Sequence, residues 1–134
     1  MVIVDSTVWI DYLNGTSTPE AEWFDARLSV ERFGLLDLMV CEILQGLSTD
    51  LQAARVLGHL KRFELFSSGG VELAVDAAAA YRALRTRGRT VRSTVDCLVA
   101  AFCIRGGHQL LHCDRDFDPF EAHLGLQVVR PGAG

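Results

Sequence analysis

Short apolar runs recur along the chain, and longer segments with helical spacing of apolar residues separate them. Runs of this kind predict strands that are buried on both faces, as in parallel sheets. The predicted strands are Val2–Val4, Phe33–Leu35, Phe63–Phe66, Gln109–Cys113 and Leu126–Val129.

The segments between the runs predict helices. They cover Val8–Leu13, a segment beginning at Pro19, Asp37–Leu47, Leu51–Leu60, Val71–Arg87, a segment ending at Ile104, and Pro119–His123. Short polar side chains that accept hydrogen bonds from the backbone mark helix starts. We therefore expect Ser6 or Thr7 to cap the first helix, Asp37 the third, and Ser93 or Thr94 the helix that ends at Ile104.

This alternation of strands and helices predicts an α/β fold in which helices cover both faces of a parallel sheet. With 134 residues and no linker or repeat, we expect one domain over residues 1–134. Sites in such folds lie beyond the carboxyl ends of the strands. Asp5 and Asp114 both follow predicted strands, so the order of elements predicts that these two acids lie near each other.

The composition is that of a folded globular protein, because 49% of the residues are hydrophobic and 22% are charged. The sequence shows neither a membrane-spanning apolar run nor a basic-then-apolar leader, so we expect a cytoplasmic protein without membrane association. The four cysteines lack C-x-x-C spacing, which favours reduced, buried thiols over disulfides or a zinc site.

Acidic side chains stand at positions that are unusual for solvated carboxylates. Asp5 ends an apolar strand, Glu42 lies in a mainly apolar helix, and Asp96 lies in the first turn of another. Asp114 and Asp116 follow a further apolar run. Gathered and partly dehydrated carboxylates repel one another unless a cation neutralises them. Oxygen ligands suit Mg²⁺ or Mn²⁺, so the set predicts a metal-dependent phosphodiesterase site.

Helix capping is the competing explanation for several acids. Asp5 precedes the first helix, and Asp96 stands at the end of a sequence that resembles a capping box, Ser93–Asp96. Asp118 is followed by Pro119 and, three residues after it, by Glu121, so we assign Asp118 to capping. For Asp5 we prefer a metal-site role; for Asp96 the residues alone leave both roles open.

The net charge of −4 is a weak objection to a nucleic-acid partner, because without the five site acids the charge would be +1. The basic residues cluster, and five arginines fall between positions 82 and 92. Arg87, Arg89 and Arg92 are candidates for contacts to the phosphates of a nucleic acid, although a solvated helix end is the alternative.

The residues that surround these acids resemble a known family. The segments Val2–Ile10, Glu42–Gly46, Thr90–Ala101 and Asp114–Phe117 look like the four motifs of PIN-domain ribonucleases, and most resemble the VapC toxins of bacterial toxin–antitoxin pairs. Each motif is weak alone, but the ordered set is specific and the resemblance extends to about Val129. The segment before Glu42 departs from the usual strand of the family.

The resemblance implies a three-layer α/β/α PIN-like domain with a mainly parallel sheet and Mg²⁺ dependence, with Mn²⁺ as a substitute. It also implies endonucleolytic cleavage of RNA, a VapB-type antitoxin that blocks the active site, and a toxin homodimer. By position, Asp5, Glu42, Asp96 and Asp114 form the acidic quartet, with Asp116 as an adjunct. Ser6 or Thr7 matches the hydroxyl that orients a ligand or water.

The acids predict hydrolysis by a metal-activated water that leaves a 5′-phosphate and a 3′-hydroxyl. An antitoxin helix would need an apolar groove, to which Trp9, Tyr12 and Leu13 are candidate contributors; core packing is the alternative. A non-catalytic PIN-like RNA-binding or scaffold module is the main rival function, but such a module is expected to lack an acid of the quartet. A receiver-type phosphatase is disfavoured, because the only lysine, Lys61, lies in a helical segment.

Overall fold

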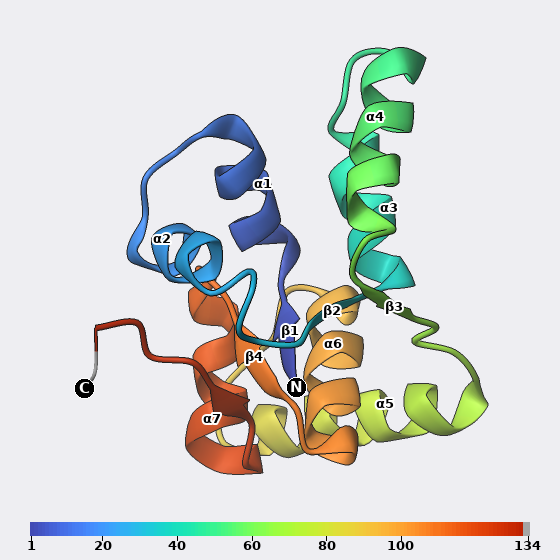
Figure 1. The fold of residues 1–134 in the computed structure, drawn as a ribbon. Coiled ribbons are helices and arrows are strands. Elements are labelled where there is room, and N and C mark those ends of the chain that lie inside the picture. The colour runs from blue at the N-terminus through green and yellow to red at the C-terminus, as the bar shows by residue number, and fades with distance from the viewer. Residues whose placement is uncertain (133–134) are drawn as a thin grey trace.

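The computed structural model describes residues 1–132 as alternating strands and helices (Figure 1). The strands are β1 (Val2–Val4), β2 (Phe33–Leu36), β3 (Glu64–Phe66), β4 (Gln109–Leu111) and β5 (Gln127–Val128). The helices are α1 (Ser6–Asn14), α2 (Pro19–Ala26), α3 (Asp37–Gln45), α4 (Asp50–Leu60), α5 (Val71–Thr86), α6 (Thr94–Gly106) and α7 (Asp118–Leu124). A short 3₁₀ helix, η1 (Arg115–Phe117), precedes α7. All five strands thus lie where the apolar runs predicted them.

The strands form one sheet in the order β3-β2-β1-β4-β5, and each neighbouring pair is parallel. Val2 of the central strand β1 is level with Phe33 of β2 on one side and with Gln109 of β4 on the other. The carboxyl ends of the strands therefore lie along the same edge of the sheet, as the sequence predicted.

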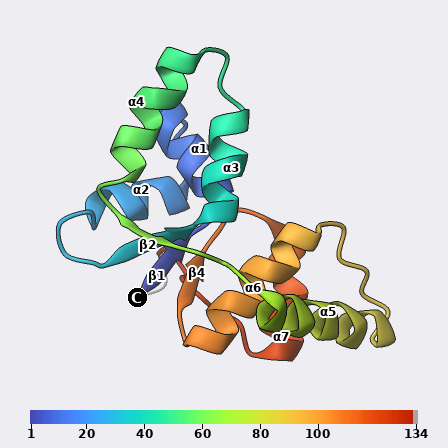
Figure 2. The ribbon, with the colours of Figure 1, turned by 90° about the vertical axis from the view of Figure 1, so that its right-hand side faces the viewer.

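Helices cover both faces of the sheet, which confirms the three-layer α/β/α architecture. In Figure 2, α1 to α4 lie above the sheet and α5 to α7 lie below it. The chain order explains this division: β1 to β3 proceed toward one edge, whereas β4 and β5 extend toward the other. Because crossovers between parallel strands are right-handed, the two directions place their helices on opposite faces.

The core lies between these layers. All three residues of β1 are buried, and so are Leu110 and Leu111 of β4. On the α1 side, the Trp9 ring is fully buried, with its centroid 4.8 Å from that of Phe24 and 4.9 Å from that of Phe63. Trp9 is therefore a core residue, and Tyr12 and Leu13 are only partly buried against it.

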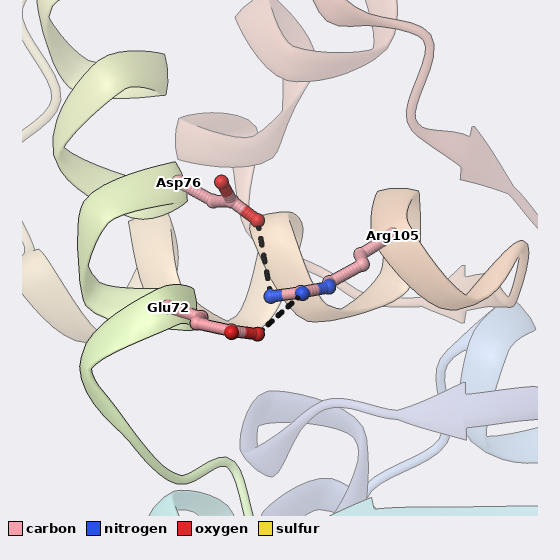
Figure 3. A network of polar contacts seen from close by, with 3 residues as sticks. All are labelled: Glu72, Asp76 and Arg105. Atoms are coloured by element: carbon pink, nitrogen blue, oxygen red, sulfur yellow. Dashed lines mark hydrogen bonds and ion pairs between the residues drawn. The ribbon is translucent and has the colours of Figure 1, made fainter.

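Ion pairs join α5 to α6 on the opposite face of the sheet. Arg105, in the last turn of α6, donates to Glu72 at 2.8 Å and to Asp76 at 3.3 Å, both of them on α5 (Figure 3). All three side chains are at least half exposed, so each pair contributes little to stability.

Three of the predicted helix caps are wrong. Helix α1 begins at Ser6, and its N-cap is Asp5, whose carboxylate accepts a hydrogen bond from the Thr7 N–H. Asp37 is the first residue of α3 rather than its cap. Its Oδ1 accepts hydrogen bonds from the backbone N–H of Leu38 and of Ser68, and the latter lies in the loop after β3.

Asp118 also lies inside its helix. Phe117 precedes α7 and is itself helical, with φ −83° and ψ −17°, because η1 leads directly into the helix. The capping role in this segment belongs to Asp114, whose side chain accepts from the Asp116 N–H at the start of η1. Ser93 caps α6, as one of the two predicted alternatives.

Two elements end earlier than predicted. Strand β4 stops at Leu111, because the N–H of Cys113 donates to the Thr7 side chain instead of to a neighbouring strand. Helix α3 stops at Gln45. Within residues 1–132, no helix combines the length and the apolar character needed to cross a bilayer.

Candidate active site

The central strand β1 is the point where the order of connections reverses. Its neighbours are β2 and β4, which are reached by connections that run in opposite directions across the sheet. The gap beyond the carboxyl ends of such strands is where ligands bind in open α/β sheets. Asp5 follows β1 directly, and its N–H donates to the Leu111 carbonyl at the end of β4, at 2.9 Å.

Thr7 fastens Asp5 to the segment that follows β4. Its hydroxyl donates to Asp5 Oδ2 at 2.7 Å and accepts from the Cys113 N–H at 3.2 Å. Asp5 is 3% exposed, and burial raises the pKa of its carboxyl, while the hydrogen bonds from Thr7 oppose the rise. Asp5 is thus a buried acid with a fixed orientation.

Glu42 approaches the same place from α3. Ser6, the first residue of α1, donates its hydroxyl to Glu42 Oε1 at 3.2 Å. The adjacent hydroxyls of Ser6 and Thr7 therefore hold two different acids, Glu42 and Asp5. The sequence predicted that one of these hydroxyls orients a ligand, and the structure gives each of them a carboxylate partner.

Asp96 enters from the first turn of α6. Ser93 Oγ accepts from the Asp96 N–H at 3.3 Å, so the cap of the helix fixes the backbone of this acid. An acid at this position is also favoured by the positive end of the helix dipole. The capping interpretation and the site interpretation of this segment are therefore compatible.

Asp114 and Asp116 complete the cluster from the start of η1. Asp114 Oδ1 accepts from the Asp116 N–H at 2.9 Å, and His112 Nδ1 accepts from the Asp114 N–H at 3.1 Å. One carboxylate oxygen each from Asp96, Asp114 and Asp116 lies within 4.8 Å of the others.

The charges of the five acids are coupled. The pKa of Asp96 is raised to about 7, first by burial and then by Asp114, Asp5, Asp116 and Glu42. The raised pKa shows that burial and the surrounding negative charges oppose ionisation of Asp96. The donor set consists of carboxylate oxygens and fits a hard divalent cation such as Mg²⁺ or Mn²⁺.

The structure brings the five predicted acids together, and the roles of the predicted quartet in metal binding stay predictions. Asp116, expected to be an adjunct, contributes an oxygen to the close trio, and the charges of Asp5 and Glu42 act on Asp96. The role of His112 in anchoring Asp114 was not predicted, since a histidine two residues before an acid is not a specific signal.

The predicted RNA-contacting arginines lie beside α6. Arg87, Arg89 and Arg92 are exposed between the end of α5 and the start of α6. None of them forms an ion pair with another residue of the described chain, and Arg87 Nη1 lies 3.4 Å from His123 Nδ1. Their guanidinium groups are therefore available to a ligand.

The protein is a three-layer α/β/α domain that gathers carboxylates beside β1, where the direction of the connections between strands reverses. Sequence comparisons give its family. The model of the PIN domain family matches residues 2–121. Ribonuclease VapC11 of Mycobacterium tuberculosis (strain H37Rv) and VapC ribonuclease Mb1587 of Mycobacterium bovis are each 35% identical to the chain. Both alignments cover 96% of this chain and 98% of the relative. The chain therefore belongs to the PIN-domain family and, within it, to the VapC proteins.

Solved structures with the same fold include toxin–antitoxin complexes. VapBC2 from Rickettsia felis, bound to a DNA fragment from its promoter, gives a TM-score of 0.76 at 13% identity and covers 96% of this chain and 98% of that chain. VapBC-1 from nontypeable Haemophilus influenzae gives 0.72 at 16% identity, with coverage of 96% and 97%. At these identities the likeness is one of fold.

Proposed function

We propose that this chain is a divalent-metal-dependent endoribonuclease and acts as the toxin of a VapBC-type toxin–antitoxin pair. The observation that carries the proposal is the close trio Asp96, Asp114 and Asp116, with the pKa of Asp96 raised to about 7 at the carboxyl edge of the sheet. Membership of the VapC proteins and the names of the two mycobacterial relatives support RNA as the substrate.

The proposed reaction is hydrolysis of an RNA phosphodiester. The oxygen of one water joins the phosphorus and the bond from phosphorus to O3′ breaks, which leaves a 5′-phosphate and a 3′-hydroxyl. Mg²⁺, or Mn²⁺ in its place, would be held by Asp96, Asp114 and Asp116, with Asp5 and Glu42 adding negative charge nearby. When bound, such a cation polarises the phosphate and lowers the pKa of a coordinated water.

The chain's own groups supply orientation and charge. Ser93 and His112 fix the backbones of Asp96 and Asp114, and Thr7 and Ser6 hold the carboxylates of Asp5 and Glu42. Support of this kind for metal ligands and their neighbours typically changes affinity or activity by about 10- to 100-fold when it is removed. The arginines between α5 and α6 would neutralise backbone phosphates.

We also propose a VapB-type antitoxin as protein partner and a homodimer as the toxin's own assembly. The VapBC complexes among the structural neighbours support the first of these. The chain offers an apolar surface on α1, where Ile10 is 41% exposed and Tyr12 and Leu13 are partly buried. We also propose that the protein acts in the cytoplasm, where it would meet RNA and its antitoxin.

The test is cleavage of end-labelled total RNA by the purified chain, separated from any antitoxin, with Mg²⁺, with Mn²⁺ and with EDTA. The Asp96→Asn and Asp5→Asn variants provide matched controls, because each removes one charge with almost no change in shape. We expect discrete, metal-dependent fragments from the wild type and a loss of at least about tenfold in both variants.

Other results have specific meanings. Equal cleavage by wild type and variants would assign the activity to a contaminant. Fragments with 2′,3′-cyclic phosphate ends would contradict attack by water. RNA binding without cleavage, by a folded chain under every metal condition, would favour the non-catalytic RNA-binding module.

A further inference from the structure

A cavity of about 460 Å³ adjoins the acidic cluster and has no role in the site described so far. It lies between the start of α2, the segment from β4 to η1, and the chain after β5. Asp114, one of the three clustered acids, forms part of its wall. A ligand in this cavity would therefore contact Asp114.

The walls of the cavity combine two kinds of surface. Pro19 and Val129 provide apolar faces, whereas Glu20, Arg115 and His112 provide hydrogen-bonding groups. Its volume is within the range of about 300–1,000 Å³ that is usual for small-ligand sites. Such walls would bind a ligand that combines a flat apolar ring, polar groups at the edge of the ring and a charged group.

Arg115 is a basic residue of this cavity that has no acidic partner among residues 1–132. It is exposed and forms no ion pair within residues 1–132, although acids precede and follow it in the sequence. Arg130, the other arginine in the lining, is already paired with Glu121. A guanidinium that is not committed to a protein carboxylate is available for a phosphate.

We infer that this cavity holds the one nucleotide of an RNA strand that lies next to the cleaved phosphodiester. The base rests between Pro19 and Val129 and presents its polar edge to Glu20, while Arg115 contacts the phosphate of that nucleotide. The inference rests on the proposed ribonuclease function and adds to it the subsite that makes cleavage depend on sequence. A free anion would use the arginine but neither the apolar walls nor the acid.

The experiment uses a short RNA that contains a bond cleaved by the wild type, together with versions in which one base at a time is removed near that bond. We compare kcat/KM for the wild type, Arg115→Ala, Arg115→Lys and Arg105→Ala. Arg105 is the matched control, because it is also an exposed arginine but is held by Glu72 and Asp76 between α5 and α6 (Figure 3).

In the wild type, we expect removal of one base beside the cleaved bond to lower kcat/KM by about tenfold or more, given that a base contact is worth about 1–3 kcal/mol. In Arg115→Ala, kcat/KM for the intact RNA should fall. Removal of the base beside the cleaved bond should then lower kcat/KM further by only about twofold or less. In Arg105→Ala, removal of that base should lower kcat/KM as much as in the wild type. Arg115→Lys should show an intermediate loss.

Each contrary outcome identifies what has failed. If the wild type cleaves RNA but no single base beside the bond matters, the subsite is wrong and the ribonuclease function stands. The same holds if Arg115→Ala lowers cleavage equally for every substrate, since a disturbed acidic cluster would have that effect. If the wild type cleaves no RNA, the proposed function fails and the subsite fails with it.

Discussion

Asp96 shows at the scale of one residue how the fold gives a carboxyl group its chemistry. Its pKa is raised to about 7, mainly by burial and then by four neighbouring acids. In the unfolded chain the pKa would return to about 3.8. Between these values the folded chain binds a proton that the unfolded chain has lost, so stability falls as pH rises from about 4 to 7.

Asp96→Asn should therefore stabilise the metal-free chain at high pH. We expect a gain on the order of 1 kcal/mol at pH 8, after allowance for solvent screening of a partly exposed group, and almost no gain near pH 4. Urea unfolding in EDTA at several pH values measures this difference. Added Mg²⁺ should stabilise the wild type more than the variant. If the free energy of unfolding changed with pH in the same way for both chains, the raised pKa of Asp96 would be contradicted.

At the scale of an element, β2 shows how closely the sheet is packed under the site. Gly34 pairs with Ile3 of β1 on one side and with Glu64 of β3 on the other. A Cβ added at Gly34 would lie 2.7 Å from Phe66 Cε2, 2.9 Å from Met1 Sδ and 3.1 Å from the Glu64 carbonyl oxygen. The strand that leads into the Glu42 helix thus depends on the absence of a side chain.

Gly34→Ala should destabilise the chain by about 1–3 kcal/mol, because both side chains and the neighbouring strand must shift. Gly58→Ala is the matched control, since Gly58 lies in α4 and a Cβ there would meet no atom within 4 Å. That change should stabilise the chain by about 0.5–1 kcal/mol through helix propensity. Thermal or urea unfolding distinguishes the two, and equal stabilities would show that β2 tolerates a side chain.

At the scale of the whole molecule, acidic and basic groups are each concentrated in particular segments. The net charge is −4, yet the carboxylates of the site gather at one edge of the sheet while five exposed arginines lie between positions 82 and 92. This distribution allows an acidic protein to hold a polyanion, because a divalent cation reduces the charge of the acids and the arginines contact phosphates.

In a chain that also carries Asp96→Asn to slow cleavage, Arg92→Ala should weaken RNA binding and flatten its dependence on salt. Removing the interaction with one phosphate of single-stranded RNA lowers the slope of log K against log salt by about 0.7. Arg105→Ala, with its side chain held by two acids of α5, should leave the slope unchanged. Fluorescence anisotropy across a salt series measures both variants, and an unchanged slope for Arg92→Ala would place this arginine outside the RNA path.

Hydrophobic patterning predicted the class of fold, a parallel sheet with helices on both faces, but not the order of the strands. Strands β1 and β2 are short and buried along their whole length, so each appears in the sequence as an apolar run, whereas β3 and β5 are only partly buried. Alternation with helices then implies parallel strands, which place Asp5 and Asp114 at one edge. The five acids were predicted as candidate site residues because burial of unpaired carboxylates is costly, and their roles in metal binding stay predictions.

Only the tertiary structure decided which groups hold these acids. Asp5 caps α1, Asp37 and Asp118 do not cap their helices, and β4 ends early; these outcomes depend on hydrogen bonds to the backbone and on how one element continues into the next. The bond from the Cys113 N–H to Thr7 spans 106 positions of the chain. Local preferences act over a few residues. The close trio joins α6 to the start of η1, and the cavity beside Asp114 joins the start of α2 to the segments after β4 and β5. No local pattern specifies these meetings.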